Sequence, residues 1–139
     1  MKLPQVMGAV LTIALLVSGG PVSAGIIGKS NEDVKKIADP LIDGVFDGLM
    51  QGDYKVYTEH FDLALRETIS ENRFKEIYDD VRYSLGQYLY REYLGFLNKE
   101  QVTVVLYKGM FDKTANEVFV RVTISKRDQD IAITGLTFE

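Results

Sequence analysis

Few side chains in this sequence have the type and spacing that chemistry requires. His60 is the only histidine, and Asp62 stands two positions after it. A histidine can act as an acid or base near neutral pH, but a catalytic one normally has an orienting partner, and the spacing identifies none for His60. At the end of a short predicted helix, His60 also suits a structural role, because the helix dipole stabilises a cation there. We therefore predict a structural role, and keep His60, Asp62 and Tyr93 as the acid/base residues of an alternative, enzymatic interpretation.

Three carboxylates recur every four residues in the predicted first helix, at Asp39, Asp43 and Asp47. A cation could bridge them, but calcium loops wrap oxygen ligands around the ion rather than lining them along a helix. We predict a solvated acidic face. The absence of cysteine excludes disulfides and thiolate metal sites, and no glycine-rich phosphate loop or Ser-His-Asp order is present. No metal or cofactor is therefore expected.

A second group of polar side chains lies on predicted strands. Arg91 and Tyr93 share one face of a strand and Glu92 takes the other, while Lys108 shares a face with Leu106 on the next strand. Charges near the open end of a curved sheet can contact a ligand, but charges on an exposed edge also discourage association. We favour the second role, in which charges on an exposed edge discourage association. Tyr93, Lys108 and His60 are the candidates for ligand binding.

Composition limits the class of protein and of partner. A chain of 139 residues is typical of one domain that builds its own core. Its 16 basic and 20 acidic residues give a net charge of −4, and removal of residues 1–24 takes away only Lys2, which leaves 15 against 20, or −5. A nucleic-acid partner is therefore not expected.

Residues 1–24 have the segment order of a secretory signal. Lys2 gives a positive start, residues 6–17 form an apolar core, and Gly19-Gly20-Pro21 precede Val22-Ser23-Ala24. We predict cleavage after Ala24, then a short linker over residues 25–30 and a single domain over residues 31–139. The mature chain would be secreted, periplasmic or on the cell surface, without a membrane contact. The alternative is an uncleaved anchor, for which the apolar core is short.

The first half of the mature chain has helical periodicity. Apolar residues at three- and four-residue spacing predict one helix over residues 31–51, capped by Ser30 and kinked at Pro40, with a second start at Pro40 as the alternative. Gly52 and Asp53 end it and cap a short helix over residues 54–61, and residues 62–69 are ambiguous. Ser70 is expected to cap a further helix that ends at Gly86.

The second half is rich in β-branched and aromatic residues. Runs at 87–98, 101–111, 117–126 and 130–139 predict four antiparallel strands, and the second run, apolar on both faces, is expected to be central. In the third run Val118, Val120, Val122 and Ile124 share the inner face, with Glu117, Arg121, Thr123 and Ser125 outside. A change of parity at Gly135 predicts a β-bulge. The predicted class is α+β, with N-terminal helices packed on a curved, four-stranded antiparallel sheet.

These patterns resemble a family of small secreted domains of unknown function with the cystatin-like cone fold, in the nuclear transport factor two-like superfamily. The segments that carry the resemblance are Ala38-Asp39-Pro40, Gly52-Asp53-Tyr54, Glu92-Tyr93-Leu94-Gly95-Phe96, Val104-Val105-Leu106-Tyr107-Lys108-Gly109-Met110-Phe111 and Ile133-Thr134-Gly135-Leu136-Thr137-Phe138. The resemblance implies a sheet wrapped around the first long helix, with a pocket in the open end. It implies no chemistry for any residue.

The function we expect is that of a non-catalytic extracytoplasmic module. It would bind a small apolar molecule or a protein through the cone or the sheet, and a homodimer is one form of such pairing. The alternative is a metal-free isomerase- or dehydratase-like enzyme. The two differ in one structural feature, since the enzyme needs a carboxylate or His60 inside a closed apolar pocket with a second polar group facing it.

Overall fold

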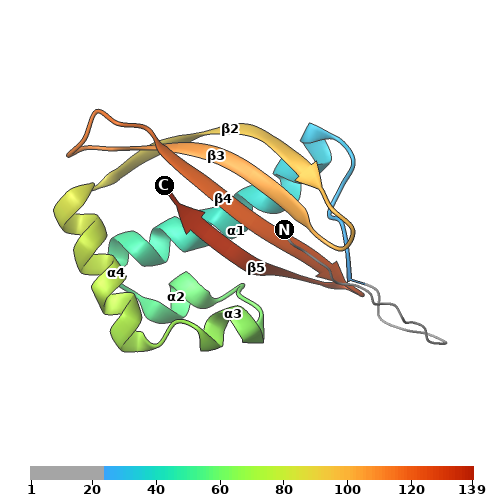
Figure 1. Ribbon diagram of the computed structural model, residues 1–139, viewed down its shortest axis with the longest axis horizontal. Coiled ribbons are helices and arrows are strands. Elements are labelled where there is room, and N and C mark those ends of the chain that lie inside the picture. Colours follow the sequence, from blue (N-terminus) through green and yellow to red (C-terminus); the bar gives the residue numbers. More distant parts are fainter. Residues whose placement is uncertain (1–23) are drawn as a thin grey trace, which may run out of the picture.

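The computed structural model describes residues 24–139, so nearly all of the predicted signal, residues 1–23, lies outside the described residues. Helices come first and the main strands follow (Figure 1). The elements are β1 (Ala24–Gly25), α1 (Asn31–Gln51), α2 (Tyr54–Thr58), α3 (Leu63–Glu67), α4 (Glu71–Ser84), β2 (Tyr88–Asn98), β3 (Thr103–Phe111), β4 (Val118–Arg127) and β5 (Asp130–Phe138).

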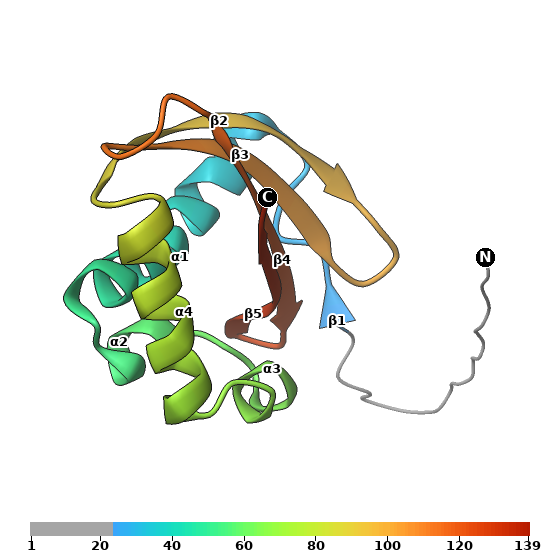
Figure 2. The ribbon, with the colours of Figure 1, turned by 60° about the vertical axis from the view of Figure 1, so that its left-hand side comes forward.

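Strands β2, β3, β4 and β5 form one antiparallel sheet in that order, and it curves over α1 (Figures 1 and 2). The predicted α+β class and the central place of β3 are confirmed. β1 adds a further pairing, because Gly25 lies opposite Lys126 of β4. Ile27 is buried, and its amide donates to Thr103 Oγ1. The segment predicted as a linker is thus attached to the domain at Gly25 and Ile27.

α1 supplies the helical side of the core. It is one helix with Pro40 inside it, as predicted, and the Ser30 side chain accepts from the Asp33 amide at its start. Gly52 ends it with φ 69°, a left-handed conformation that glycine adopts without a Cβ penalty. Its buried face carries Val34, Ala38, Leu41, Ile42, Val45, Phe46, Gly48 and Leu49.

The inner face of β4 is as predicted, because Val118, Val120, Val122 and Ile124 are all buried. Ser125, which was expected on the outer face, is buried. Its hydroxyl donates to the Gln101 carbonyl oxygen at 3.0 Å, so the loop before β3 covers it. A hydrogen-bonded hydroxyl can be buried at little cost.

The bulge predicted in β5 is confirmed, but the reason for its glycine differs. Thr123 lies opposite Gly135 and Ile124 opposite Ile133, so Thr134 is the extra residue. Gly135 does not have a positive φ. A Cβ at Gly135 would instead lie 3.3 Å from the Thr123 side chain, so this position favours glycine because the neighbouring strand is close.

The remaining helices, α2, α3 and α4, lie at the open end of the sheet. α2 is shorter than predicted, and the ambiguous segment contains α3. α4 begins at its predicted cap, Ser70, and buries a single residue, Phe74, against the rings of Tyr54 and Tyr57. Between residues 24 and 139 no helix is both long and apolar enough to cross a bilayer.

Candidate functional site

The two acid/base candidates near α2 have structural positions. The His60 side chain is 40 % exposed, and its Nε2 lies 3.8 Å from Glu59 Oε2. The backbone carbonyl oxygen of His60 accepts from the Ile133 amide at 2.7 Å. Asp62 caps α3, since its Oδ1 accepts from the Leu65 amide at 2.8 Å. Both residues therefore fix the α2–α3 connection against β5, and neither lies in an enclosed apolar pocket facing a second polar group.

The other two candidates lie on β2 and β3. The Tyr93 hydroxyl donates to Asn31 Oδ1 at 2.8 Å, and the Lys35 ammonium lies 4.9 Å from the ring centroid. Lys108 is on the outer face, where its ammonium lies 2.8 Å from Glu117 and 3.5 Å from Glu92. The hydrogen bond to Glu117 raises the pKa of Lys108. Tyr93, Lys108 and His60 thus have separate partners and do not form one binding site.

A polar cluster that the sequence did not predict joins α1 to the sheet. Arg91 Nη2 lies 2.8 Å from Asp43 and 3.7 Å from Asp39, and the Arg91 side chain is only 14 % exposed. The Tyr107 hydroxyl donates to Asp39 Oδ1 at 2.8 Å. The acidic residues were predicted as a solvated face, which holds for Asp47 but not for Asp39. The face that Arg91 shares with Tyr93 on the predicted strand was the one sequence signal for this contact.

Electrostatics fix the protonation states of Arg91 and Tyr107 in this cluster. Burial acts to lower the pKa of Arg91, but hydrogen bonds with Tyr88 and Asp43 outweigh it and the pKa is raised. Burial raises the pKa of Tyr107, and its hydrogen bond to Asp39 raises it further. Arg91 therefore stays charged and Tyr107 stays a neutral donor at physiological pH.

The cluster borders a hollow of about 330 Å³, lined by Lys35, Asp39, Tyr88, Leu89, Tyr90, Arg91, Tyr93 and Tyr107. Asp39 is the carboxylate that faces a second polar group here, but its side chain is 36 % exposed and lies 3.7 Å from both Lys35 and Arg91. Its charge is matched by these cations rather than held in an apolar enclosure. The geometry is that of a structural ion pair between α1 and β2.

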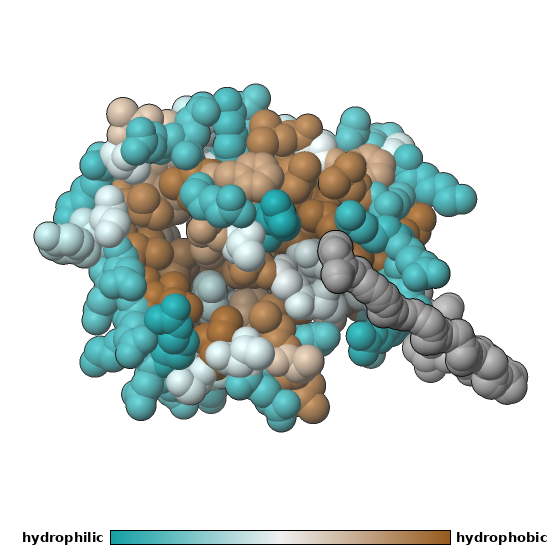
Figure 3. Space-filling view, in the orientation of Figure 1, coloured by the Kyte–Doolittle hydropathy of each residue, from teal (hydrophilic) through white to brown (hydrophobic). Residues whose placement is uncertain are grey.

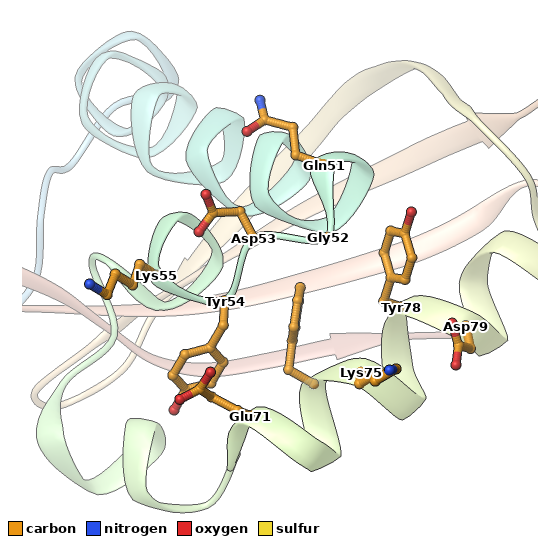
Figure 4. A pocket seen from close by; sticks show the side chains of 10 residues that line it. Gln51, Gly52, Asp53, Tyr54, Lys55, Glu71, Lys75, Tyr78 and Asp79 are labelled. Atoms are coloured by element: carbon orange, nitrogen blue, oxygen red, sulfur yellow. The ribbon is translucent and has the colours of Figure 1, made fainter.

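A larger hollow, of about 740 Å³, lies between α4 and the turn that joins α1 to α2 (Figure 4). Tyr54 and Tyr78 stand on opposite sides of it, and its rim carries both signs of charge from Lys55, Lys75, Glu71 and Asp79. Asp53 is used as the cap of α2, because its Oδ1 accepts from the Val56 amide at 3.1 Å. The hollow is wide, and its charges do not converge on one point.

A third hollow of about 300 Å³ has a different character. It lies between α4 and the ends of the strands, and we call it the α4–β5 groove, lined by Asp80, Val81, Ser84, Leu85, Val118, Phe138 and Glu139. Apolar side chains gather on this side of the molecule (Figure 3). α4 buries a single residue, Phe74. Val81 and Leu85 are only half-buried where they line the groove. Such a concave apolar surface with a few polar groups is typical of a ligand site.

Within residues 24–139 no group of three or more histidine or acidic side chains is arranged to hold a metal ion. Comparisons of the chain with protein-family models, with curated proteins and with solved structures each return no match.

Proposed function

We propose that this protein is a non-catalytic binding module whose α4–β5 groove takes an apolar group. The observation that carries this proposal is the half-covered apolar face of α4. Val81 and Leu85 pack against the edge of the core but are only half-buried, and with Val118 and Phe138 they line a hollow of about 300 Å³. An unfilled apolar hollow forfeits contacts on its lining, and an apolar occupant would restore them.

The resemblance to the cystatin-like cone and the nuclear transport factor two-like superfamily is part of the same proposal. It is supported by the order of helices and strands and by a sheet that curves over α1 (Figure 2). In such a cone the groove is the open end, between the last strand and the helix that covers it.

The groove is tested with two uncharged apolar probes, decanol and the dye N-phenylnaphthylamine, because its polar side chains include two acids and no base. We expect saturable dye fluorescence that decanol displaces. Val81→Asp should abolish both signals, because it introduces a carboxylate into the groove. The matched control is Tyr83→Asp, which adds the same charge to the same helix at a side chain that is 83 % exposed. Equal binding by both variants, or no saturable binding by the unsubstituted protein, would contradict the proposal.

We also propose that the module acts outside the cytoplasm, on the basis of the signal-like order of residues 1–24. Cleavage after Ala24 would retain the pairing of Gly25 with Lys126. The intact mass of the chain recovered from its host checks this proposal. A mass that starts at Gly25 supports it, and a full-length chain in the membrane fraction supports the anchor instead.

Pairing of two copies through the sheet stays a prediction. The outer face of the sheet exposes Leu94 and Leu97 and half-exposes Leu106. The ion pairs of Lys108 with Glu92 and Glu117 interrupt this apolar surface. Light scattering of the chain from Gly25 onward would detect a dimer.

A further inference from the structure

β5 is an edge strand whose final part has free backbone groups. Phe119 and Glu139 exchange both backbone hydrogen bonds, at 2.7 and 2.8 Å. Bonded and non-bonded pairs alternate along an antiparallel ladder, so Phe138 opposite Val120 and Leu136 opposite Val122 are non-bonded pairs. Their amides and carbonyls therefore point away from β4. Among residues 24–139 no strand pairs with β5 on this side beyond Ile133.

The earlier part of the same edge already holds an extended segment. Phe61 forms a parallel bridge with Ile133, whose amide donates to the His60 carbonyl at 2.7 Å. The Ile133 carbonyl accepts from the Asp62 amide at 2.9 Å. A strand can therefore reach this edge of β5 on the side where the helices lie. The pairing of the α2–α3 connection with β5 stops where the chain turns into α3.

The opposite edge of the sheet is less suited to a further strand. β2 has register shifts between Tyr88 and Tyr90 and between Tyr93 and Gly95, where it pairs with β3. Bulges of this kind twist an edge and interrupt its row of donors and acceptors, which prevents pairing with another chain. β5 has no register shift after Gly135, so Leu136 and Phe138 present a regular edge.

The α4–β5 groove lies beside this free edge, as Phe138 belongs to both. Side chains of an added strand alternate between two faces, so every second one would reach toward Val81 and Leu85. The polar side chains of the groove are Asp80, Ser84 and Glu139, which include two acids and no base. A guest strand with a basic residue at its end would complement this charge.

We propose that an extended peptide segment adds to the free edge of β5 and inserts an apolar side chain into the α4–β5 groove, with a Lys or Arg beside Asp80 and Glu139. This inference rests on the proposed function and specifies its partner as a protein segment. Affinity comes from the amides and carbonyls of Leu136 and Phe138, and selectivity from the groove. In recognition by strand addition, main-chain hydrogen bonds provide affinity and side-chain pockets provide selectivity.

The test uses a seven-residue peptide of alternating valine and threonine with a lysine at each end. Its matched control has the same side chains but N-methylated valines, so it lacks the amides that pair with an edge. We expect saturable binding of the first peptide only. Amide exchange measured by NMR should slow at Leu136 and Phe138 when this peptide binds, because their amides gain partners, and should not slow when decanol binds.

A charge reversal tests the orientation of the guest. Asp80→Lys should weaken binding of the lysine-ended peptide by about three- to fivefold, the usual scale of an exposed ion pair. Asp79→Lys is the control, since Asp79 lines the large polar hollow and not the groove. A glutamate-ended peptide should show the opposite preference for Asp80→Lys. Equal effects of the two substitutions would overturn the proposed placement of the basic end.

Three outcomes separate this inference from the proposed function. Equal binding of the methylated and unmethylated peptides overturns strand addition but leaves an apolar groove. Binding of decanol without either peptide, at unchanged exchange of Leu136 and Phe138, does the same. Failure of decanol, the dye and both peptides overturns the proposed function together with the inference.

Discussion

Arg91 holds α1 against the edge strand of the sheet. Its guanidinium contacts the carboxylates of Asp39 and Asp43, donates to the Asp39 carbonyl oxygen at 3.3 Å and lies 5.2 Å from the centroid of the Tyr107 ring. This carbonyl belongs to the backbone of α1, one residue before Pro40. The Arg91 side chain therefore contacts two carboxylates and one carbonyl oxygen of the helix backbone.

Replacing Arg91 by methionine should destabilise the protein because Asp43 loses its cation and Asp39 keeps only Lys35. Hydrogen bonds to charged groups contribute about 1.5–3 kcal/mol, and we expect a loss of that size in the free energy of unfolding. Urea denaturation measures it. Lys35→Met is the control, because Lys35 is 45 % exposed and 3.7 Å from Asp39, so its loss should be under about 0.5 kcal/mol. Equal losses would show that Arg91 is no more than a surface charge.

Tyr57 predicts how stability changes at high pH. Burial raises the pKa of Tyr57 to about 12, although Arg73 acts to lower it. Between about pH 10 and 12 the unfolded chain loses this proton while the folded chain keeps it, so stability falls as the pH rises. A shift of about two units corresponds to roughly 2–3 kcal/mol, present below pH 10 and lost through pH 12.

Tyr57→Phe removes this titration, so the variant should lose less stability than the unsubstituted protein between pH 8 and pH 11. At pH 8 the two should be nearly equal, because the Tyr57 hydroxyl has no hydrogen-bond partner within residues 24–139. Urea unfolding at both pH values is the measurement. If the free energy of unfolding fell equally in the two proteins, the role assigned to Tyr57 would be contradicted. The fall would then come from groups that both proteins keep, such as Tyr107.

At the scale of elements, the contact between α1 and α2 depends on one glycine. A Cβ added at Gly48 would meet the Tyr57 amide nitrogen and Cα within 2.5 Å. These are backbone atoms that cannot move aside without shifting α2. Gly44, one turn earlier, has only the His60 ring near it, at 3.8 Å, which is an ordinary contact distance.

The same substitution should therefore have opposite effects at the two positions. Gly48→Ala should lower the free energy of unfolding by about 2 kcal/mol or more, because it forces the two helices apart. Gly44→Ala should raise it by up to about 1 kcal/mol, because alanine is the better helix former. Thermal melts of both variants measure these shifts. Stabilisation by both alanines would mean that α2 moves freely relative to α1.

At the scale of the whole molecule, the core is unevenly shared. α1, β3 and β4 supply most of the buried residues, whereas α4 supplies Phe74 alone. Free energies of local opening follow such differences in burial. α4 is therefore an element that can move without disrupting the sheet, and it is also the wall of the α4–β5 groove.

Native-state hydrogen exchange should show this difference directly. We expect amides of α4 to exchange at least about tenfold faster than those of α1, a difference of about 1.4 kcal/mol in opening free energy. The comparison uses hydrogen-bonded amides in the middle of each helix, so that fraying of the ends does not contribute. Equal protection in the two helices would show that α4 opens only with global unfolding.

The sequence alone determined the features that depend on near neighbours. Ser30, Asp53 and Ser70 cap their helices as predicted, because each side chain bonds an amide three residues ahead. The inner face of β4 followed from period-two alternation, and the bulge in β5 from a change in that alternation. These local signals were sufficient for the α+β class.

Only the tertiary structure decided which distant residues meet. Ser125 is buried because the loop before β3 covers it, and Asp39 contacts Arg91 because the inner face of β2 lies against α1. The α4–β5 groove requires the placement of a helix beside the last strand, which no local period encodes. Contacts between segments far apart in the chain depend on how whole elements pack, and that packing is set by the sum of many weak interactions rather than by any one motif.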